Sequence, residues 1–249
     1  MAFSPEERQR YARHLDLPGF GGRAQEKLRA GRVLVVGCGG LGSPALFYLA
    51  AAGVGRLGLM DSDHVEISNL QRQILHATPD IGRSKVDSAV ARLRALNPHV
   101  RLEPHPERLT AGNAPDLFAP YDLILDCTDN FAAKYLISDA CVAAKKPFVY
   151  AGISGFCGQI LTVRPGQSAC LRCVFPEPPP EPKAPAGPLG AIPGVIGSLQ
   201  AVEALKFLAG LGNLLTDTLL TYDGLEAAFK PVHAHRNPAC PACGASAKK

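Results

Sequence analysis

The chain has 249 residues, of which 47% are hydrophobic and 19% charged, and its formal net charge is +4. This length allows one large domain or two small ones, with a core that needs no disulfides. The charge is spread along the chain, which argues against binding to nucleic acid or an anionic membrane. The N-terminus lacks an apolar signal core, and the most apolar stretch, residues 41–54, is too short to span a bilayer. We therefore expect a cytoplasmic protein.

The first part of the chain predicts alternating helices and strands. Ser4-Pro5-Glu6-Glu7 has the pattern of a capped helix start, and a short helix is expected over 25–29. Val33–Val36 is a short β-branched run typical of a strand buried on both faces. Further strands are expected at 56–60, 100–103, 121–126 and 148–151, with helices ending near Gly53, over 84–96 and through Lys145. This order predicts an α/β fold: a doubly wound, Rossmann-like and mostly parallel sheet with helices on both faces.

After Gly152 the pattern changes to a C-terminal antiparallel extension. Strands are expected at 158–163, 218–222 and 227–232, with an apolar helix over 195–208. Between them, residues 176–193 hold eight of the 22 prolines, which predicts a long loop. We expect one domain over 1–249 in three parts: N-terminal helices (1–31), a nucleotide-binding core (32–152) and a C-terminal part (153–249).

The core carries a glycine-rich turn, Gly37-Cys38-Gly39-Gly40-Leu41-Gly42, directly after a strand and before a helix. Glycine lets the backbone approach a phosphate, and the free N–H groups of the helix N-terminus attract it. Asp61 ends the next strand, where a carboxylate commonly accepts ribose hydroxyls. The motif predicts nucleotide binding without separating a dinucleotide from ATP. The alternative is a glycine-rich turn that serves close packing of strand and helix.

Three later features favour ATP. A polar segment from Asp61 to Gln73 contains Arg72, Lys85 starts a helix, and Asp129 follows a strand at the sheet edge where ligands bind. Two cations suit phosphate oxygens, and a carboxylate suits a hard Mg²⁺ ion. Taken individually, Arg72 and Lys85 are compatible with solvated surface charges, and Asp129 with a helix N-cap.

Together these pieces resemble a known family. Five motifs occur in this order: GCGGLG, MDSDHVEISNLQRQ, GRSKV, DCTDN and GVIGSLQAVEALK. One CxxC pair precedes the last motif and a second pair follows it. The series closely resembles the MoeB/ThiF/HesA family of adenylyltransferases, the bacterial relatives of ubiquitin-activating enzymes, and above all its MoeB branch. The resemblance runs from Arg10 to the last cysteine pair, and NLQRQ is its most specific block.

The resemblance implies a set of site residues. Arg13, Arg72, Lys85 and Asp129 are the expected catalytic residues, with Asp129 carrying magnesium and Arg13 reaching into the partner's site of a homodimer. The nucleotide is expected to contact Gly37, Gly39, Gly40, Gly42, Asp61, Ser68, Asn69, Leu70, Gln71, Arg72, Gln73, Lys85, Asp129 and Asn130.

Eight cysteines are present, and four of them form two CxxC pairs, Cys170/Cys173 and Cys240/Cys243. Four thiolates fill a tetrahedral zinc shell, so we expect a structural Zn²⁺ that ties the C-terminal tail to the domain, rather than redox-active dithiols. The other four are expected to be small buried hydrophobes: Cys38, Cys127, Cys141 and Cys157.

By resemblance, the expected reaction is ATP-dependent adenylylation of the C-terminal glycine carboxylate of a small ubiquitin-fold sulfur carrier with a Gly-Gly tail. The reaction releases pyrophosphate and is a step in sulfur transfer for molybdopterin or thiamine biosynthesis or a similar pathway. Some relatives carry a cysteine in the loop after the first CxxC pair, but residues 176–194 contain none. This favours an enzyme that stops at the acyl-adenylate and relies on a separate sulfur donor.

Three alternatives stay open at the level of sequence. A nicotinamide or flavin oxidoreductase uses the same glycine loop, but NLQRQ, Lys85 and Asp129 argue against it. A non-catalytic scaffold, like the inactive half of a heterodimeric activating enzyme, should have lost the arginine, the lysine or the magnesium aspartate. A non-protein carboxylate as substrate would keep the chemistry and change only the acceptor.

Overall fold

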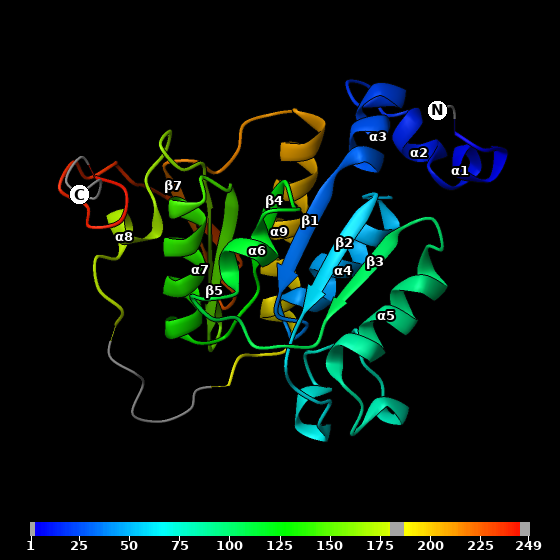
Figure 1. The fold of residues 1–249 in the computed structure, drawn as a ribbon, viewed down its shortest axis with the longest axis horizontal. Helices are drawn as coiled ribbons and strands as arrows, with labels where there is room; N and C mark the ends of the chain where they lie inside the picture. The colour runs from blue at the N-terminus through cyan, green and yellow to red at the C-terminus, as the bar shows by residue number, and fades with distance from the viewer. Residues whose placement is uncertain (1–2, 180–186, 245–249) are drawn as a thin grey trace.

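One eight-stranded sheet runs through the molecule in the computed structural model, which describes residues 3–179 and 187–244 (Figure 1). The strand order is β3-β2-β1-β4-β5-β6-β7-β8. Neighbours pair in parallel from β3 to β5 and antiparallel from β5 to β8. The strands are β1 (Arg32–Val36), β2 (Arg56–Met60), β3 (Arg101–His105), β4 (Leu123–Asp126), β5 (Phe148–Ser154), β6 (Cys157–Val163), β7 (Thr218–Asp223) and β8 (Ala228–His233). The expected doubly wound sheet and its antiparallel extension are confirmed.

Helices cover both faces of this sheet (Figure 1). Those of the described residues are α1 (Pro5–Arg10), α2 (Ala12–Leu15), α3 (Gly21–Ala30), α4 (Gly42–Ala51), α5 (Lys85–Leu96), α6 (Ala114–Phe118), α7 (Phe131–Ala143), α8 (Leu171–Val174) and α9 (Ala191–Ala209), with 3₁₀ turns at Ile67–Asn69 and Thr78–Asp80. Side chains from α4, α5 and α9 share one hydrophobic core, and those from α6, α7 and α8 share the other.

Strand β1 shows why the sequence forms two cores. Val33 and Val35 belong to the core under α4 and α9, whereas Leu34 and Val36 belong to the core under α7. Successive side chains of a strand point to opposite faces, so a strand covered by helices on both sides must be apolar throughout. The unbroken run Val33–Val36 meets that requirement, and all four side chains are buried.

Element boundaries differ from the sequence expectations in several places: β5 extends to Ser154, and the short helices α6 and α8 were not predicted. Helix α3 covers Gly21–Ala30, twice the predicted length, and the short helix α2 was missed. Helix α9 begins at Ala191, four residues before the predicted start, so the last residues of the predicted loop are helical. Proline has no backbone N–H, and N–H groups in the first turn of a helix make no hydrogen bond within the helix. Pro193 is therefore tolerated near the start of α9. The remainder of that predicted loop includes residues 180–186, which lie outside the described residues.

Helix α9 is the most apolar long element of the described chain. By length and composition alone it could cross a membrane. In the structure it packs against α4, β5 and β6, and Ile196, Ala201 and Ala204 are buried in the core that it shares with α4. Its apolar character is thus accounted for by packing on the sheet.

Candidate active site

The glycine-rich turn lies between β1 and α4. Gly37 has a φ of +102°, and a Cβ there would lie 2.6 Å from the carbonyl oxygen of Cys127. A Cβ at Gly42 would collide with the carbonyl oxygen of Gly37. Close packing of β1, α4 and the β4 loop therefore explains both glycines. Gly37, Gly39 and Gly40 also line the large cavity, so the motif serves both close packing and the cavity wall.

Asp61 closes this turn from the end of β2. Its carboxylate accepts hydrogen bonds from the backbone N–H of Cys38 at 2.8 Å and of Asp63 at 2.9 Å. Both bonds hold the carboxylate beside the glycine turn and in the cavity wall. Next to it, the Nζ of Lys85 pairs with the Oδ2 of Asp63 at 2.9 Å. The Lys85 side chain is 8% exposed and that of Asp63 is 65% exposed, so the lysine is the fixed partner.

A cavity of about 1120 Å³ opens at the carboxyl ends of β1 and β4. The strand order reverses between these two strands, which is the position where doubly wound sheets bind ligands. The volume slightly exceeds the range of about 300–1000 Å³ typical of small-molecule pockets. Its wall includes nine of the predicted site residues: Gly37, Gly39, Gly40, Asp61, Arg72, Gln73, Lys85, Asp129 and Asn130.

The remaining predicted site residues are absent from the described lining of this cavity: Arg13, Gly42, Ser68, Asn69, Leu70 and Gln71. Several of them support the lining instead. The carbonyl oxygen of Ser68 accepts a hydrogen bond from Arg72 Nη1 at 3.1 Å, and that of Asn69 accepts one from the Gln73 N–H. Arg13 lies exposed on α2.

Gln73 offers a test of whether a polar ligand fits. It is 5% exposed, and its side-chain oxygen has no hydrogen-bond partner within the part of the chain that the structure describes. The amide lies against Gly39, where a Cβ would come 3.4 Å from its Nε2. A buried amide group with an unused hydrogen-bonding atom costs free energy unless a ligand or water meets it. The unpartnered atom is an acceptor, so it suits an N–H or O–H donor of a ligand or a water, whereas the glycine turn beside it suits phosphate oxygens.

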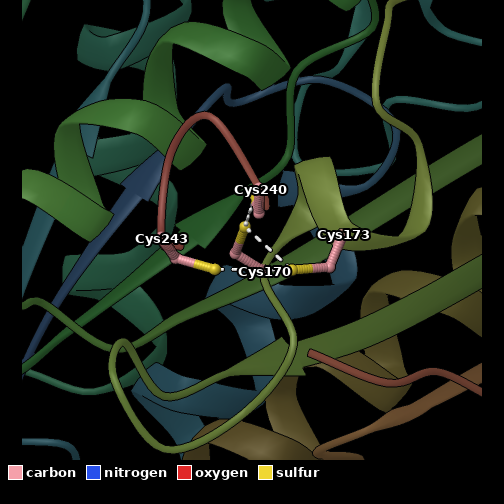
Figure 2. A group of neighbouring side chains, drawn as sticks. All are labelled: Cys170, Cys173, Cys240 and Cys243. Carbon is pink, nitrogen blue, oxygen red and sulfur yellow. Dashed lines mark hydrogen bonds between the residues drawn. The ribbon is translucent and has the colours of Figure 1, made fainter. Parts of the chain in front are cut away.

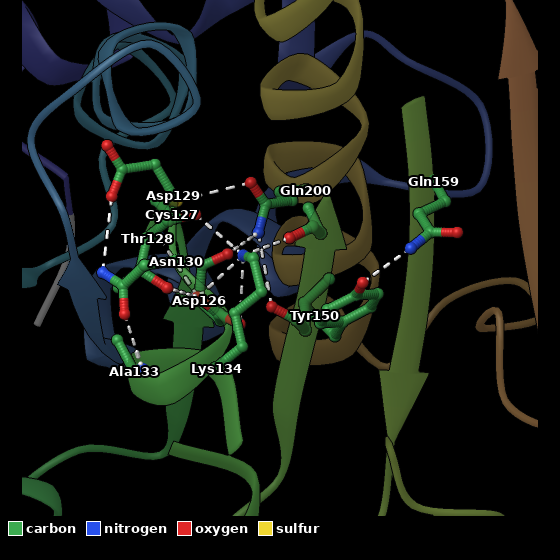
Figure 3. A network of polar contacts seen from close by, with 12 residues as sticks. Asp126, Cys127, Thr128, Asp129, Asn130, Ala133, Lys134, Tyr150, Gln159 and Gln200 are labelled. Carbon is green, nitrogen blue, oxygen red and sulfur yellow. Dashed lines mark hydrogen bonds and ion pairs between the residues drawn. The ribbon is translucent and has the colours of Figure 1, made fainter. Parts of the chain in front are cut away.

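The loop after β4 carries the DCTDN motif (Figure 3). Asp126 is fully buried, and its Oδ1 accepts hydrogen bonds from the Thr128 N–H at 3.1 Å and the Thr128 hydroxyl at 2.6 Å. Asn130 is the N-cap of α7, since its Oδ1 accepts a hydrogen bond from the Ala133 N–H at 2.9 Å. Capping therefore does not require Asp129, whose exposed carboxylate lies in the cavity wall.

Lys134 is a cavity residue that the sequence reasoning missed. It is 5% exposed, and its Nζ donates to the carbonyl oxygens of Thr128 at 2.7 Å and Ala151 at 2.5 Å (Figure 3). It also pairs with Asp126 at 3.3 Å. The available signal was a lysine one turn after an Asn cap in an otherwise apolar helix, which is too weak alone to assign a role.

The far wall of the cavity comes from the antiparallel extension and was also missed. Its residues on β6, β7 and β8 include Cys157, Gln159, Asp223 and Lys230. Cys157 is exposed, so the expectation that it is buried was wrong, because it lies at the start of β6 beside a turn. Cys38, Cys127 and Cys141 are buried as expected, and burial raises the pKa of all three thiols.

The two CxxC pairs meet at one point (Figure 2). The sulfur atoms lie 3.7 Å apart for Cys170 and Cys173, 3.6 Å for Cys170 and Cys240, and 3.4 Å for Cys173 and Cys243. All four lie within 4.8 Å of one another. Tetrahedral zinc with Zn–S bonds of about 2.3 Å requires sulfurs roughly 3.8 Å apart. The donor set and its spacing therefore fit a closed zinc site.

Comparison with known proteins identifies a family match and relatives that align with nearly the whole of this chain. The model of the ThiF family matches residues 11–242. A sulfur carrier protein adenylyltransferase of Thermus thermophilus is 48% identical over 98% of this chain and 93% of its own length. The probable adenylyltransferase/sulfurtransferase MoeZ of Mycobacterium tuberculosis is 46% identical over 96% of the chain. The adenylyltransferase and sulfurtransferase MOCS3 of Sus scrofa is 48% identical over 98% of the chain. The chain spans 63% of the MoeZ protein and 54% of the MOCS3 protein.

Solved structures share the fold at lower sequence identity. Escherichia coli MccB in complex with MccA-N7isoASN superposes with a TM-score of 0.85 at 22% identity, covering 97% of this chain and 75% of that one. Selenomethionine-labelled PaaA superposes with a TM-score of 0.79 at 22% identity, covering 94% of this chain and 76% of its own. These likenesses concern the arrangement of the sheet and its helices.

Proposed function

The chain belongs to the ThiF family, and on that premise we propose that it is an adenylyltransferase that activates the C-terminal carboxylate of a small ubiquitin-fold sulfur carrier. The main support is the cavity, where the glycine turn, Arg72 and Lys85 face the same space as the exposed Asp129. Near-complete coverage of a sulfur carrier protein adenylyltransferase at 48% identity supports the same reaction.

ATP is the nucleotide that this site suits. The N-terminus of α4 and the glycine turn offer backbone N–H groups to phosphate oxygens, and Asp61 offers a carboxylate to ribose hydroxyls. We infer that Lys85 leaves Asp63 for a phosphate oxygen when ATP binds, since the exposed Asp63 side chain is free to turn toward solvent. Arg72, which is half-buried and held by Ser68, lines the same cavity.

Asp129 and the DCTDN loop would hold magnesium. A Mg²⁺ ion takes oxygen ligands and commonly binds through one or two carboxylates together with substrate phosphates. Such an ion would neutralise charge on the triphosphate. Asn130 and Thr128 fix the loop that carries Asp129, so the carboxylate is presented to the cavity without having to cap α7.

In the reaction we propose, an oxygen of the carrier's terminal carboxylate bonds to the α-phosphorus of ATP, and the bond from that phosphorus to the bridging oxygen of pyrophosphate breaks. The attacking group is already ionised, so no general base is needed. Arg72 and Lys85 stabilise the charge that builds on phosphate oxygens, which is the main way proteins accelerate this chemistry. The wall from β6 to β8 gives the carrier tail a place to lie.

Further parts of the proposal rest on family membership. The four-cysteine cluster would hold structural zinc, because a closed sulfur shell has no vacancy for a substrate. Arg13 would complete the site of a second copy in a homodimer, consistent with its exposed position on α2. We propose that residues 1–249 form one catalytic domain. We also propose that the protein is cytoplasmic. The sulfur reaches the carrier from a separate donor, because residues 176–194 contain no cysteine.

The test is ATP–pyrophosphate exchange with Mg²⁺, measured with and without small Gly-Gly-tailed carriers. We expect exchange that depends on a carrier, and the carrier that supports it names the pathway. Exchange supported instead by a small-molecule carboxylate would change the substrate class. Absence of exchange with all carriers, in a preparation that still binds ATP, would overturn the enzymatic assignment in favour of a scaffold.

A further inference from the structure

A second, smaller cavity of about 100 Å³ adjoins the active-site cavity. It lies between α7, the β5–β6 pair and the segment that follows α8. Six of its wall residues are aromatic, aliphatic or proline: Phe131, Tyr135, Tyr150, Leu171, Phe175 and Pro179. Phe131 and three further wall residues also line the large cavity, so the two spaces share a wall. We refer to this space as the side pocket.

The polar groups around the side pocket are engaged with the protein itself. The ammonium of Lys134 has three N–H donors, and it meets Thr128, Ala151 and Asp126. The Tyr135 hydroxyl donates to the carbonyl oxygen of Phe175 at 2.9 Å. Figure 3 shows the remaining pair: Gln159 Nε2 donates to the Tyr150 hydroxyl at 2.6 Å. An apolar group in the side pocket leaves all of these bonds intact.

The volume limits what can enter. An apolar cavity of about 150 Å³ accepts benzene, and one water molecule occupies about 30 Å³. A space of about 100 Å³ matches the size of one aliphatic side chain such as that of valine or leucine. Such a side chain must belong to something that already lies in the large cavity, because that is the space with which the side pocket shares its wall.

We propose that the side pocket binds an aliphatic side chain of the carrier's tail, from one of the residues just before the terminal Gly-Gly pair. The inference rests on the proposed function, since it requires the tail to lie in the active-site cavity. Two terminal glycines have no side chain to offer, so the first residue able to fill the pocket precedes them. An extended residue spans about 3.3 Å, so two glycines carry the chain roughly 7 Å away from the reacting carboxylate.

The wall of the side pocket is held before any tail arrives. Arg172 on α8 pairs with both carboxylate oxygens of Asp139 on α7 at 2.8 Å and lies over the ring of Tyr135. Its Nη1 also donates to the carbonyl oxygen of Pro176 at 3.2 Å. These contacts fix Phe175 and the start of the following segment against α7. A preformed pocket loses little free energy to ordering when a ligand binds, so it can discriminate between side chains.

The first experiment changes the tail. Each of the three residues before Gly-Gly in an active carrier is replaced in turn by Ala, Leu, Asp and Phe, and KM and kcat of pyrophosphate exchange are measured. We expect one position at which Leu is preferred and Asp raises KM by about tenfold or more, with kcat nearly unchanged. The other two positions should tolerate all four residues. Equal tolerance at all three positions would overturn the proposal.

The second experiment changes the enzyme. Phe175→Leu enlarges the pocket, and Phe207→Leu is the matched control, because Phe207 is half-buried on α9 and lies outside both described cavities. We expect Phe175→Leu to shift the preference at the sensitive position toward Phe by about tenfold. The control should keep the wild-type order. Zinc content and melting temperature show whether both variants are folded.

The outcomes separate the two hypotheses. If the wild-type enzyme shows no exchange with any carrier, the proposed function fails and the side pocket loses its occupant with it. If exchange is normal but Phe175→Leu and Phe207→Leu rank the tails identically, the adenylyltransferase stands and the side pocket is not a tail subsite.

Discussion

The two ends of the sheet reach their functional geometry by different means. Around β1, β2 and β4, Gly37 and Asp61 follow their strands directly, and the backbone N–H groups of Cys38 and Asp63 hold Asp61 in place. In the antiparallel extension, the residues that meet are far apart in sequence, as Cys170 and Cys240 are. The first region is defined by local motifs and strict backbone geometry, whereas the second depends on one long-range tie. Loss of an exposed cavity side chain in the first region should therefore remove chemistry, and loss of the long-range tie in the second should remove stability.

The largest effect should come from breaking that tie. Cys240→Ser removes one of the four sulfur ligands, and Cys240 is fully buried. Loss of a structural metal is among the few single changes that cost about 4–5 kcal/mol, which corresponds to roughly 10–20 °C in melting temperature for a chain of this size. Zinc content and thermal unfolding should fall together. Cys157→Ser, at the exposed cysteine, is the control for zinc content, and zinc retained by Cys240→Ser would show that the cluster is not the metal site.

The catalytic half should respond in the opposite way. Asp129→Ala is expected to lower carrier-dependent exchange by about a thousandfold, equivalent to about 4 kcal/mol of barrier, because the proposed magnesium ligand is lost. Stability and zinc content should not change, since Asn130 rather than Asp129 caps α7. Asp116→Ala, an exposed aspartate on α6, is the matched control. Near-normal exchange by Asp129→Ala would remove Asp129 from the reaction.

A glycine pair tests how strict the backbone geometry of the first region is. In Gly42→Ala the new Cβ collides with the carbonyl oxygen of Gly37, so we expect a loss of about 3 kcal/mol in the free energy of unfolding, together with weaker ATP binding. In Gly22→Ala the new Cβ meets nothing within 4 Å, and the residue lies in α3. That change should stabilise the protein by up to about 1 kcal/mol. Urea unfolding of both variants measures the difference, and equal values would contradict it.

The same contrast explains what could be predicted from sequence. The apolar run Val33–Val36 and the glycine turn depend on residues a few positions apart, so period and spacing were sufficient to predict the parallel core. The cap of α7 is Asn130, one residue after Asp129, which the sequence offered as a possible cap. The cysteine cluster is long-range, but four like ligands in two spaced pairs carry their own signal. The start of α9 was misplaced because a run of prolines indicates a loop until one proline falls within the first turn of a helix.

The rest of the site carries no local signal. Lys134 matters because Thr128, Ala151 and Asp126 come together around its Nζ, and nothing near it in sequence announces those partners. The cavity wall from β6 to β8 depends on which strands are paired, and strand order follows from tertiary contacts. Cys157 was expected to be buried because most free cysteines are, whereas its place at the start of β6 leaves it exposed.

The smallest expected effect measures how firmly the two regions are joined. Arg172 lies between the first two cysteines and pairs with Asp139 on α7, the helix that follows the loop carrying Asp129. The side chains are 24% and 41% exposed, so solvent screening limits the pair to a coupling of about 0.5–1 kcal/mol in a double-mutant cycle of Arg172→Ala and Asp139→Ala. We also expect each single variant to raise the KM for the carrier severalfold. Arg172→Ala removes the hydrogen bond to Pro176, and both variants remove the ion pair that holds α8 and the following segment against α7. Zero coupling with an unchanged KM would mean that the cysteine cluster supports the fold without reaching the active site, and the division between a chemical and a stabilising region would then be complete.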